Sequence, residues 1–131
     1  METFRVSTRE HTQLIDITNE VRKMISKSDV QDGVCVVFTP HTTAAVTINE
    51  NADPSVQHDI KLKLNDVFAD DPRFRHAEGN SDAHNKSSVI GCSEQIIIDK
   101  GNLVLGTWQG IYFCEFDGPR TRKVHVQILK A

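Results

Sequence analysis

The segment from His76 to His84 places two imidazoles and two carboxylates within nine residues, together with a glycine that can bend the backbone. Imidazole and carboxylate groups are ligands for zinc and similar divalent ions. The spacing matches no established metal signature, because the chain has neither an HExxH sequence nor a CxxC pair. The segment therefore predicts either a metal or catalytic site or a solvated polar loop, and the spacing alone leaves both interpretations open.

A second polar cluster, Thr39-Pro-His41-Thr-Thr43, follows the most apolar run of the chain. A histidine beside two hydroxyl residues at a strand end can donate several hydrogen bonds to an anion, whereas in an ordinary turn the threonines bond to their own backbone. Nearby, Asp53 precedes Pro54 and is explained as a helix cap. Glu50 has no such structural role, which favours a place for its carboxylate in a shared cleft.

Two more segments carry groups that suit a phosphorylated ligand. Trp108 and Gln109 lie between glycines and offer a stacking face and an amide, although a core tryptophan in a bulged strand fits the same residues. Arg120 and Arg122 follow a tight turn and can hold phosphate oxygens, although a solvated hairpin end is the commoner explanation. The remaining histidines have ordinary interpretations, in a polar loop, on an exposed helix face and on an exposed strand face: His11, His58 and His125.

The elements that must position these groups follow from periodicity and turn residues. Apolar residues at helical spacing predict two main helices, and a short third piece ends at Gly91. Apolar and alternating runs predict strands, one of them continuously apolar and therefore buried on both faces. The expected fold is α+β, a single-domain antiparallel β-sandwich. The expected helices lie around Val21–Ile25, over Pro54–Phe68 and over Ala83–Ile90, and the strands include Val34–Phe38, Ile96–Ile98, Leu103–Leu105, Ile111–Phe116 and Val124–Ile128.

The composition narrows the class of protein. The chain has 131 residues, which fits one domain over residues 1–131. Its formal net charge of −3 argues against a dedicated nucleic-acid binder, and no apolar run approaches the length of a membrane span. The three cysteines form no CxxC pair, so free thiols in the reducing cytoplasm are expected. No GxxxxGK[ST], GxGxxG or GxSxG sequence is present, which excludes the nucleotide and hydrolase sites that those motifs mark.

In this order, the polar segments resemble the signatures of the YjbQ family (UPF0047), a family of small bacterial and archaeal proteins. The match is collinear over nearly the whole chain, and the Gly-Thr-Trp-Gln order is its most specific part. The matching segments are His41-Thr-Thr-Ala-Ala45 with Asn49-Glu-Asn-Ala-Asp-Pro54; His76, Glu78-Gly-Asn80, His84 and Lys86-Ser87; Gly101 with Leu105-Gly-Thr-Trp-Gln-Gly-Ile111; and Asp117-Gly-Pro-Arg120 with Arg122.

The resemblance implies an α/β sandwich that assembles as a homotrimer, with a weak or secondary thiamine-phosphate synthase activity. That reaction joins a pyrimidine pyrophosphate to a thiazole phosphate and releases pyrophosphate. The resemblance also implies that histidines gather around a metal or an anion near subunit boundaries. Asp82 stands in a loop whose sequence departs from that of many members, so its role stays open.

We therefore expect three groups of site residues. The catalytic group is His41, Glu50 and His84, and a divalent ion, zinc or magnesium, is expected at His41, His76, His84 and Asp82. The substrate-binding residues are expected to be Thr42, Thr43, Asn80, Ser87, Trp108, Gln109, Arg120 and Arg122. The expected function is a thiamine-phosphate synthase-like transferase with its site between subunits. The alternative is a trimeric protein that holds a metal or a phosphorylated metabolite without catalysis.

We expect the partners to be further copies of the chain and a small phosphorylated metabolite, with neither nucleic acid nor membrane.

Overall fold

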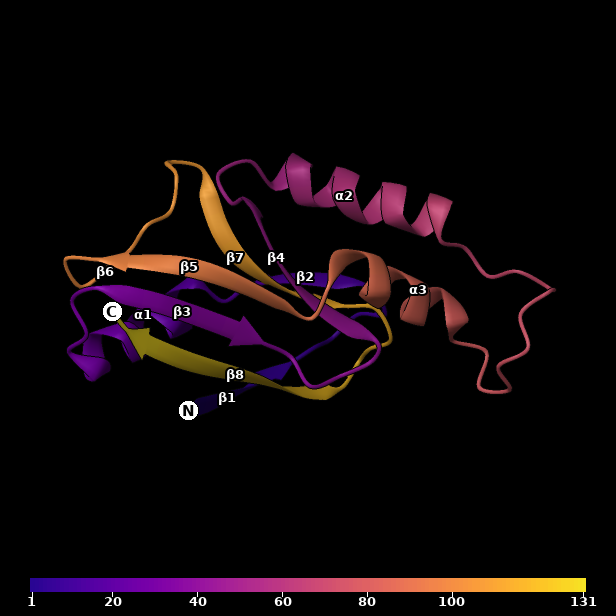
Figure 1. Cartoon of the computed structure of the whole chain (residues 1–131). Helices are drawn as coiled ribbons and strands as arrows, with labels where there is room; N and C mark the ends of the chain where they lie inside the picture. Colours follow the sequence, from indigo (N-terminus) through magenta and orange to yellow (C-terminus); the bar gives the residue numbers. More distant parts are fainter.

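Eight strands and three helices make up the computed structural model, which describes residues 1–131 (Figure 1). In chain order they are β1 Glu2–Ser7, β2 Gln13–Asp16, α1 Thr18–Ser28, β3 Gly33–Phe38, β4 Ala44–Glu50, α2 Pro54–Val67, α3 Ser81–Ile90, β5 Ser93–Asp99, β6 Asn102–Leu103, β7 Gln109–Glu115 and β8 Thr121–Lys130. The three predicted helices and four of the five named strands are present, whereas the predicted Leu103–Leu105 strand is extended only at Leu103, because β6 is Asn102–Leu103.

The strands form two antiparallel sheets that enclose the core between them. One sheet has the order β1-β8-β3-β5-β6 and the other has the order β2-β7-β4. Both sheets contribute buried apolar side chains to one cluster, including Val37 and Val126 from the first and Val46 and Phe113 from the second. The α+β sandwich predicted from the sequence is therefore confirmed.

Each helix is placed by a local feature of its sequence. On α1, Val21 and Ile25 lie one turn apart and are both buried in the core. Helix α2 starts at Pro54 because the Asp53 carboxylate accepts a hydrogen bond from the Ser55 backbone N–H, which is the predicted cap. Helix α2 buries no residue completely, whereas α3 packs against β4. No helix is long and apolar enough to cross a membrane.

The prediction that the Val34–Phe38 strand is buried on both faces is wrong. Only Cys35 and Val37 face the core and are fully buried, while Phe38 on the other face is exposed. Helix α1 contacts this sheet at β6 and β8 through core residues, and α2 and α3 contact the other sheet, so no helix of this chain covers the outer face of the five-stranded sheet. Ile97 and Leu129 are also exposed on neighbouring strands of that sheet.

One end of the sandwich collects the polar segments singled out from the sequence. The end of β3, the start of β4, the end of β7 and the start of β8 meet there, as the antiparallel registers require. The 68–80 segment between α2 and α3 extends away from the sheets and returns beside this end (Figure 1). Helix α3 begins at Ser81 rather than at the predicted Ala83, so Asp82 belongs to a helix and not to the loop.

Candidate functional site

A groove of about 350 Å³ opens at this end of the sandwich, and apart from Pro40 its lining side chains are all polar. It brings together three of the six histidines with hydroxyl, amide, carboxylate and guanidinium groups from distant parts of the chain. The lining residues are Pro40, His41, Thr42, Thr43, His76, Glu78, Asn80, His84, Asp117, Arg120 and Arg122. Eight of the residues predicted from the sequence as site residues therefore meet in one place.

Arg122 forms the floor of the groove and is only 4 % exposed. Its Nε donates to both carboxylate oxygens of Glu115, at 2.9 and 3.1 Å, and its Nη2 donates to Thr43 Oγ1 at 2.8 Å and also to Glu115. Its Nη1 donates to no group of the protein. One edge of a buried, rigidly held guanidinium is thus left for a ligand, and such an edge suits an oxyanion.

Glu115 holds Arg122 in place and is fully buried. Burial alone would raise the pKa of this carboxyl, but hydrogen bonds from Arg122, the Thr8 hydroxyl and the Asp117 backbone N–H outweigh burial and lower the pKa. The carboxylate is therefore ionised and neutralises the arginine. Glu115 was not among the predicted site residues. The signal for it was a single carboxylate within an otherwise apolar strand, which is costly unless the charge is paired.

Asp117 organises the rim of the groove. Its Oδ2 accepts a hydrogen bond from Arg120 Nη2 and another from Asn80 Nδ2, both at 2.9 Å. Arg120 also donates through Nε to the Asp117 carbonyl at 2.8 Å, although about half of its side chain is exposed. The tight turn predicted at this position therefore presents Arg120 to the groove instead of leaving it free in solvent.

The two imidazoles of the 76–84 segment are neighbours across the groove. The ring centroids of His76 and His84 are 5.3 Å apart and the rings meet edge to face. His76 Nε2 lies 3.9 Å from the carboxylate of Glu78, whose side chain is largely exposed. Both histidines line the groove near the arginines, so protonating them would add positive charge beside the floor.

His41 is held differently from the other two histidines. Its Nε2 accepts a hydrogen bond of 2.9 Å from the Lys123 backbone N–H, so the neutral ring carries its proton on Nδ1. Burial, and then the positive charge of Arg122, lower the pKa of His41. The structure therefore favours a neutral His41 that can donate from Nδ1.

This geometry predicts a pH effect on stability. Because the folded state lowers the pKa of His41, the unfolded chain binds the proton first, and the stability contributed by the neutral ring is lost as the pH falls below about 6.5. Between neutral and mildly acidic pH, we expect the unfolding free energy of His41→Asn to fall less than that of the wild type. In the control variant His11→Gln it should fall as much as in the wild type. Urea titrations across this range make the measurement, and equal pH slopes for the wild type and His41→Asn would contradict the prediction.

Three predicted residues lie far from the groove. Glu50 and Gln109 face each other at the opposite ends of β4 and β7, and Trp108 projects beside them with 62 % of its surface exposed. Seven-residue strands place these groups about 20 Å from the start of β4. A core position for Trp108 is excluded by its exposure, and one chain does not bring these three residues to the histidines.

Two other predicted residues have structural partners instead. Ser87 is buried on α3 and donates to the Ala44 carbonyl at 2.6 Å, which ties α3 to β4. Asp82 lies beside a different hollow, where its carboxylate is 3.9 Å from the ammonium of Lys86. Burial lowers the pKa of Lys86, whose Nζ donates to Asn65 Oδ1 at 2.7 Å.

The expected metal ligands do not converge in one chain. No group of three or more histidine, cysteine, aspartate or glutamate side chains is arranged to hold an ion. His41 uses Nε2 to accept a backbone hydrogen bond, and Asp82 faces Lys86, which leaves His76 and His84 as the only neighbouring pair. Structural zinc takes four ligands and catalytic zinc takes three from the protein, so this donor set does not fit a resident zinc ion.

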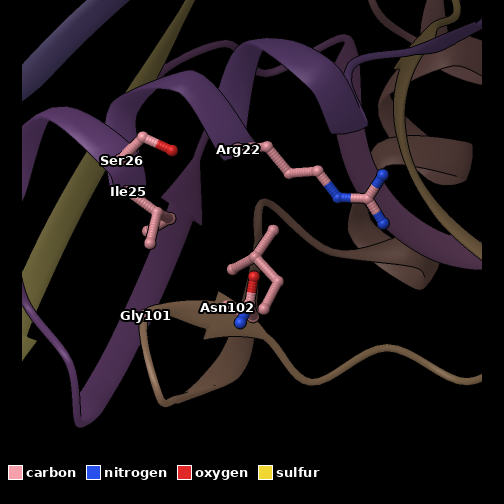
Figure 2. Close-up of a pocket in the computed structure, with 6 residues that line it drawn as sticks. Arg22, Ile25, Ser26, Gly101 and Asn102 are labelled. Atoms are coloured by element: carbon pink, nitrogen blue, oxygen red, sulfur yellow. The ribbon is translucent and has the colours of Figure 1, made fainter.

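A smaller hollow of about 240 Å³ lies at the other end of the molecule. Figure 2 shows that its side chains come from α1 and from the turn at β6, with the Arg22 guanidinium extending away from Ser26. None of the residues predicted as site residues lines it. The polar groove is therefore the candidate site that the sequence and the structure share.

Comparison with known proteins shows relatives over the full length of the chain. Residues 2–131 match the family model described as UPF0047 protein YjbQ-like. A UPF0047 protein of Methanocaldococcus jannaschii is 53% identical over 96% of this chain and 91% of its own, and the UPF0047 protein YugU of Bacillus subtilis is 45% identical over 98% of both chains. A crystal structure of an uncharacterised YjbQ/UPF0047 protein from Clostridium acetobutylicum superposes with a TM-score of 0.96, at 56% identity, and covers 98% of this chain and 100% of the other.

Proposed function

Because the chain belongs to the YjbQ-like UPF0047 family, we propose that it is a thiamine-phosphate synthase-like transferase with weak or secondary activity. The proposed reaction joins a pyrimidine pyrophosphate to a thiazole phosphate. The bond between carbon and the pyrophosphate oxygen breaks, a carbon–nitrogen bond to the thiazole forms, and pyrophosphate leaves with the electron pair. The cytoplasm is the proposed location, in keeping with three free cysteines.

The free edge of Arg122 is the observation that carries this proposal. A leaving pyrophosphate develops negative charge, and preorganised donors in a partly buried site stabilise that charge more than water does. Arg122 is fixed by Glu115, Arg120 is fixed by Asp117, and both line the groove. His84 lies beside them and can supply a further donor or a proton to the leaving group.

The proposed steps need no resident metal, because Arg120 and Arg122 line the groove and can neutralise the pyrophosphate. The expected divalent ion, zinc or magnesium, is instead proposed to arrive as the counter-ion of pyrophosphate, with His76 and His84 beside it. Metal analysis of the purified protein tests this: less than one equivalent of bound zinc is expected after dialysis.

The proposal includes a homotrimer with the site between subunits. Two features support it: Glu50 and Trp108 are remote from the groove of their own chain, and the outer face of the five-stranded sheet exposes apolar side chains. A 131-residue chain with only an open groove gains a deeper site by sharing it. Light scattering coupled to gel filtration is expected to give three times the chain mass of 14.7 kDa.

The decisive experiment supplies purified protein with both precursors and Mg²⁺ and measures thiamine phosphate by mass spectrometry. We expect product, and we expect His84→Ala to lower its rate about 100-fold, the usual effect of removing one positioned donor or acid. His58→Ala, on the exposed face of α2, is the matched control and should keep the full rate. Equal rates in the two variants would overturn the assignment of His84.

The alternative function, binding of a phosphorylated metabolite without catalysis, makes a different prediction in the same experiment. Phosphate compounds would bind in the groove and the His84→Ala and Arg120→Gln variants would bind them less tightly, yet no product would form. A groove that is open to solvent and has no converging metal ligands suits the binding of a phosphorylated metabolite.

A further inference from the structure

One buried oxygen in the groove has no hydrogen-bond partner. Asn80 Oδ1 is the only buried side-chain nitrogen or oxygen atom of the chain left without one. An unsatisfied buried acceptor costs about as much as a lost hydrogen bond, so folded proteins rarely keep one without a reason. Because Asn80 lines the groove, we look to a ligand bound there for the donor that this oxygen lacks.

The orientation of the Asn80 amide is fixed by its other end. Asn80 Nδ2 donates to Asp117 Oδ2 at 2.9 Å, and this carboxylate also accepts from Arg120. Exchanging the amide nitrogen and oxygen would set the oxygen against the carboxylate, where neither atom can donate. The oxygen therefore stays on the side away from Asp117, as an acceptor.

The groove thus offers donors and one acceptor to the same ligand. The donors are the free Nη1 of Arg122 and the side chain of Arg120, which call for an oxyanion. The acceptor, Asn80 Oδ1, can form a hydrogen bond only if the ligand carries a proton. Glu115 and Asp117 do not oppose an anion strongly, because each is paired with an arginine.

We propose that Asn80 is a specificity-determining residue, whose Oδ1 accepts a hydrogen bond from the P–OH of a hydrogen phosphate group bound by the arginines. The ligand class is hydrogen phosphate or the monoanion of a phosphate monoester, each of which keeps one P–OH, and not a fully deprotonated tetrahedral anion. This inference rests on the proposed function, since it assumes that the groove binds phosphate. Beyond the proposed function, it explains how the groove would select hydrogen phosphate over other tetrahedral anions.

Inorganic phosphate and sulfate distinguish binding of an anion by the arginines from recognition of a ligand proton by Asn80. At about pH 8 both carry close to two negative charges and have the same shape, but only phosphate retains a proton. The arginines attract both anions equally, while Asn80 Oδ1 can pair only with phosphate. We expect the wild type to bind inorganic phosphate roughly tenfold more tightly than sulfate, the effect of one buried hydrogen bond.

Calorimetric titration of the purified protein with each anion tests the inference. In Asn80→Ala we expect phosphate affinity to fall roughly tenfold to the level of sulfate, with sulfate affinity unchanged. Asn80→Ser is a second variant that keeps a residue suited to the start of α3 and also lacks the carbonyl oxygen. Asn85→Ala, at an exposed position of the same helix, is the control and should keep the selectivity.

Arg120→Gln separates this inference from the proposed function. If wild-type protein binds phosphate and sulfate equally, and Arg120→Gln weakens both, the groove is an anion site and the role of Asn80 is wrong. If neither anion binds, or if Arg120→Gln weakens neither, the groove is not an anion site, and the inference fails together with the proposed function.

Discussion

Replacing Glu115 with glutamine is expected to lower the free energy of unfolding by about 3–5 kcal/mol, because it leaves the buried guanidinium of Arg122 without its counter-charge. The glutamine amide keeps the shape of the side chain but not the charge. It also replaces one acceptor of the Arg122 and Thr8 hydrogen bonds by an N–H group. A loss of this size is a large share of the stability of a small domain.

Glu94→Gln is the matched control for this substitution. Glu94 is half-buried on β5 and makes neither a hydrogen bond nor an ion pair, and burial raises the pKa of its carboxyl. Removing that charge is expected to leave the unfolding free energy unchanged or slightly higher. Urea denaturation of both variants makes the comparison, and a similar loss in both would show that the pairing with Arg122 is not the cause.

The pair also predicts how acid acts on the fold. The folded state lowers the pKa of Glu115, so its stabilisation is complete above the pKa of an unfolded glutamate, about 4.3. It is lost as the pH falls through the lowered value in the folded state. The double variant Glu115→Gln with Arg122→Met removes both charges, and we expect it to be more stable than Glu115→Gln alone.

The sequence predicted the fold correctly where the conformation of a segment depends only on its neighbouring residues. Alternation in Val124–Ile128 and the Asp53-Pro54 start of α2 are set by neighbours in the sequence, and both predictions are confirmed. The apolar run of β3 was misread because hydrophobicity does not tell whether the second face of a strand is covered by its own chain. That information lies in the packing of elements distant in sequence.

The candidate site was predictable in its residue types but not in its grouping. The histidines, Asn80 and the arginines meet because four strand ends from both sheets share one end of the sandwich and α3 packs against β4 there. Glu50 and Trp108 were grouped with them, yet β4 and β7 carry these residues to the far end. Glu115 went unnoticed because its role depends on Arg122, a partner on the next strand.

Mixing two inactive variants is expected to restore activity if the proposed site is shared between subunits. Each site would take His84 from one chain and Glu50 from its neighbour. When His84→Ala and Glu50→Gln chains are coexpressed in equal amounts, about one quarter of the sites have both native residues. We therefore expect each variant alone to be inactive and the mixed assembly to show about one quarter of the wild-type rate of thiamine phosphate formation.

A second mixture distinguishes sites shared between subunits from a mere stabilisation of one variant chain by the other. Arg120 and His84 line the same groove of the same chain, so every groove in a mixture of Arg120→Gln and His84→Ala chains carries one defect. That mixture should stay inactive. Recovery in both mixtures would point to stabilisation, and recovery in neither would place Glu50 outside the site. Recovery only with the Glu50 variant would require that the far end of one sandwich complete the groove of another.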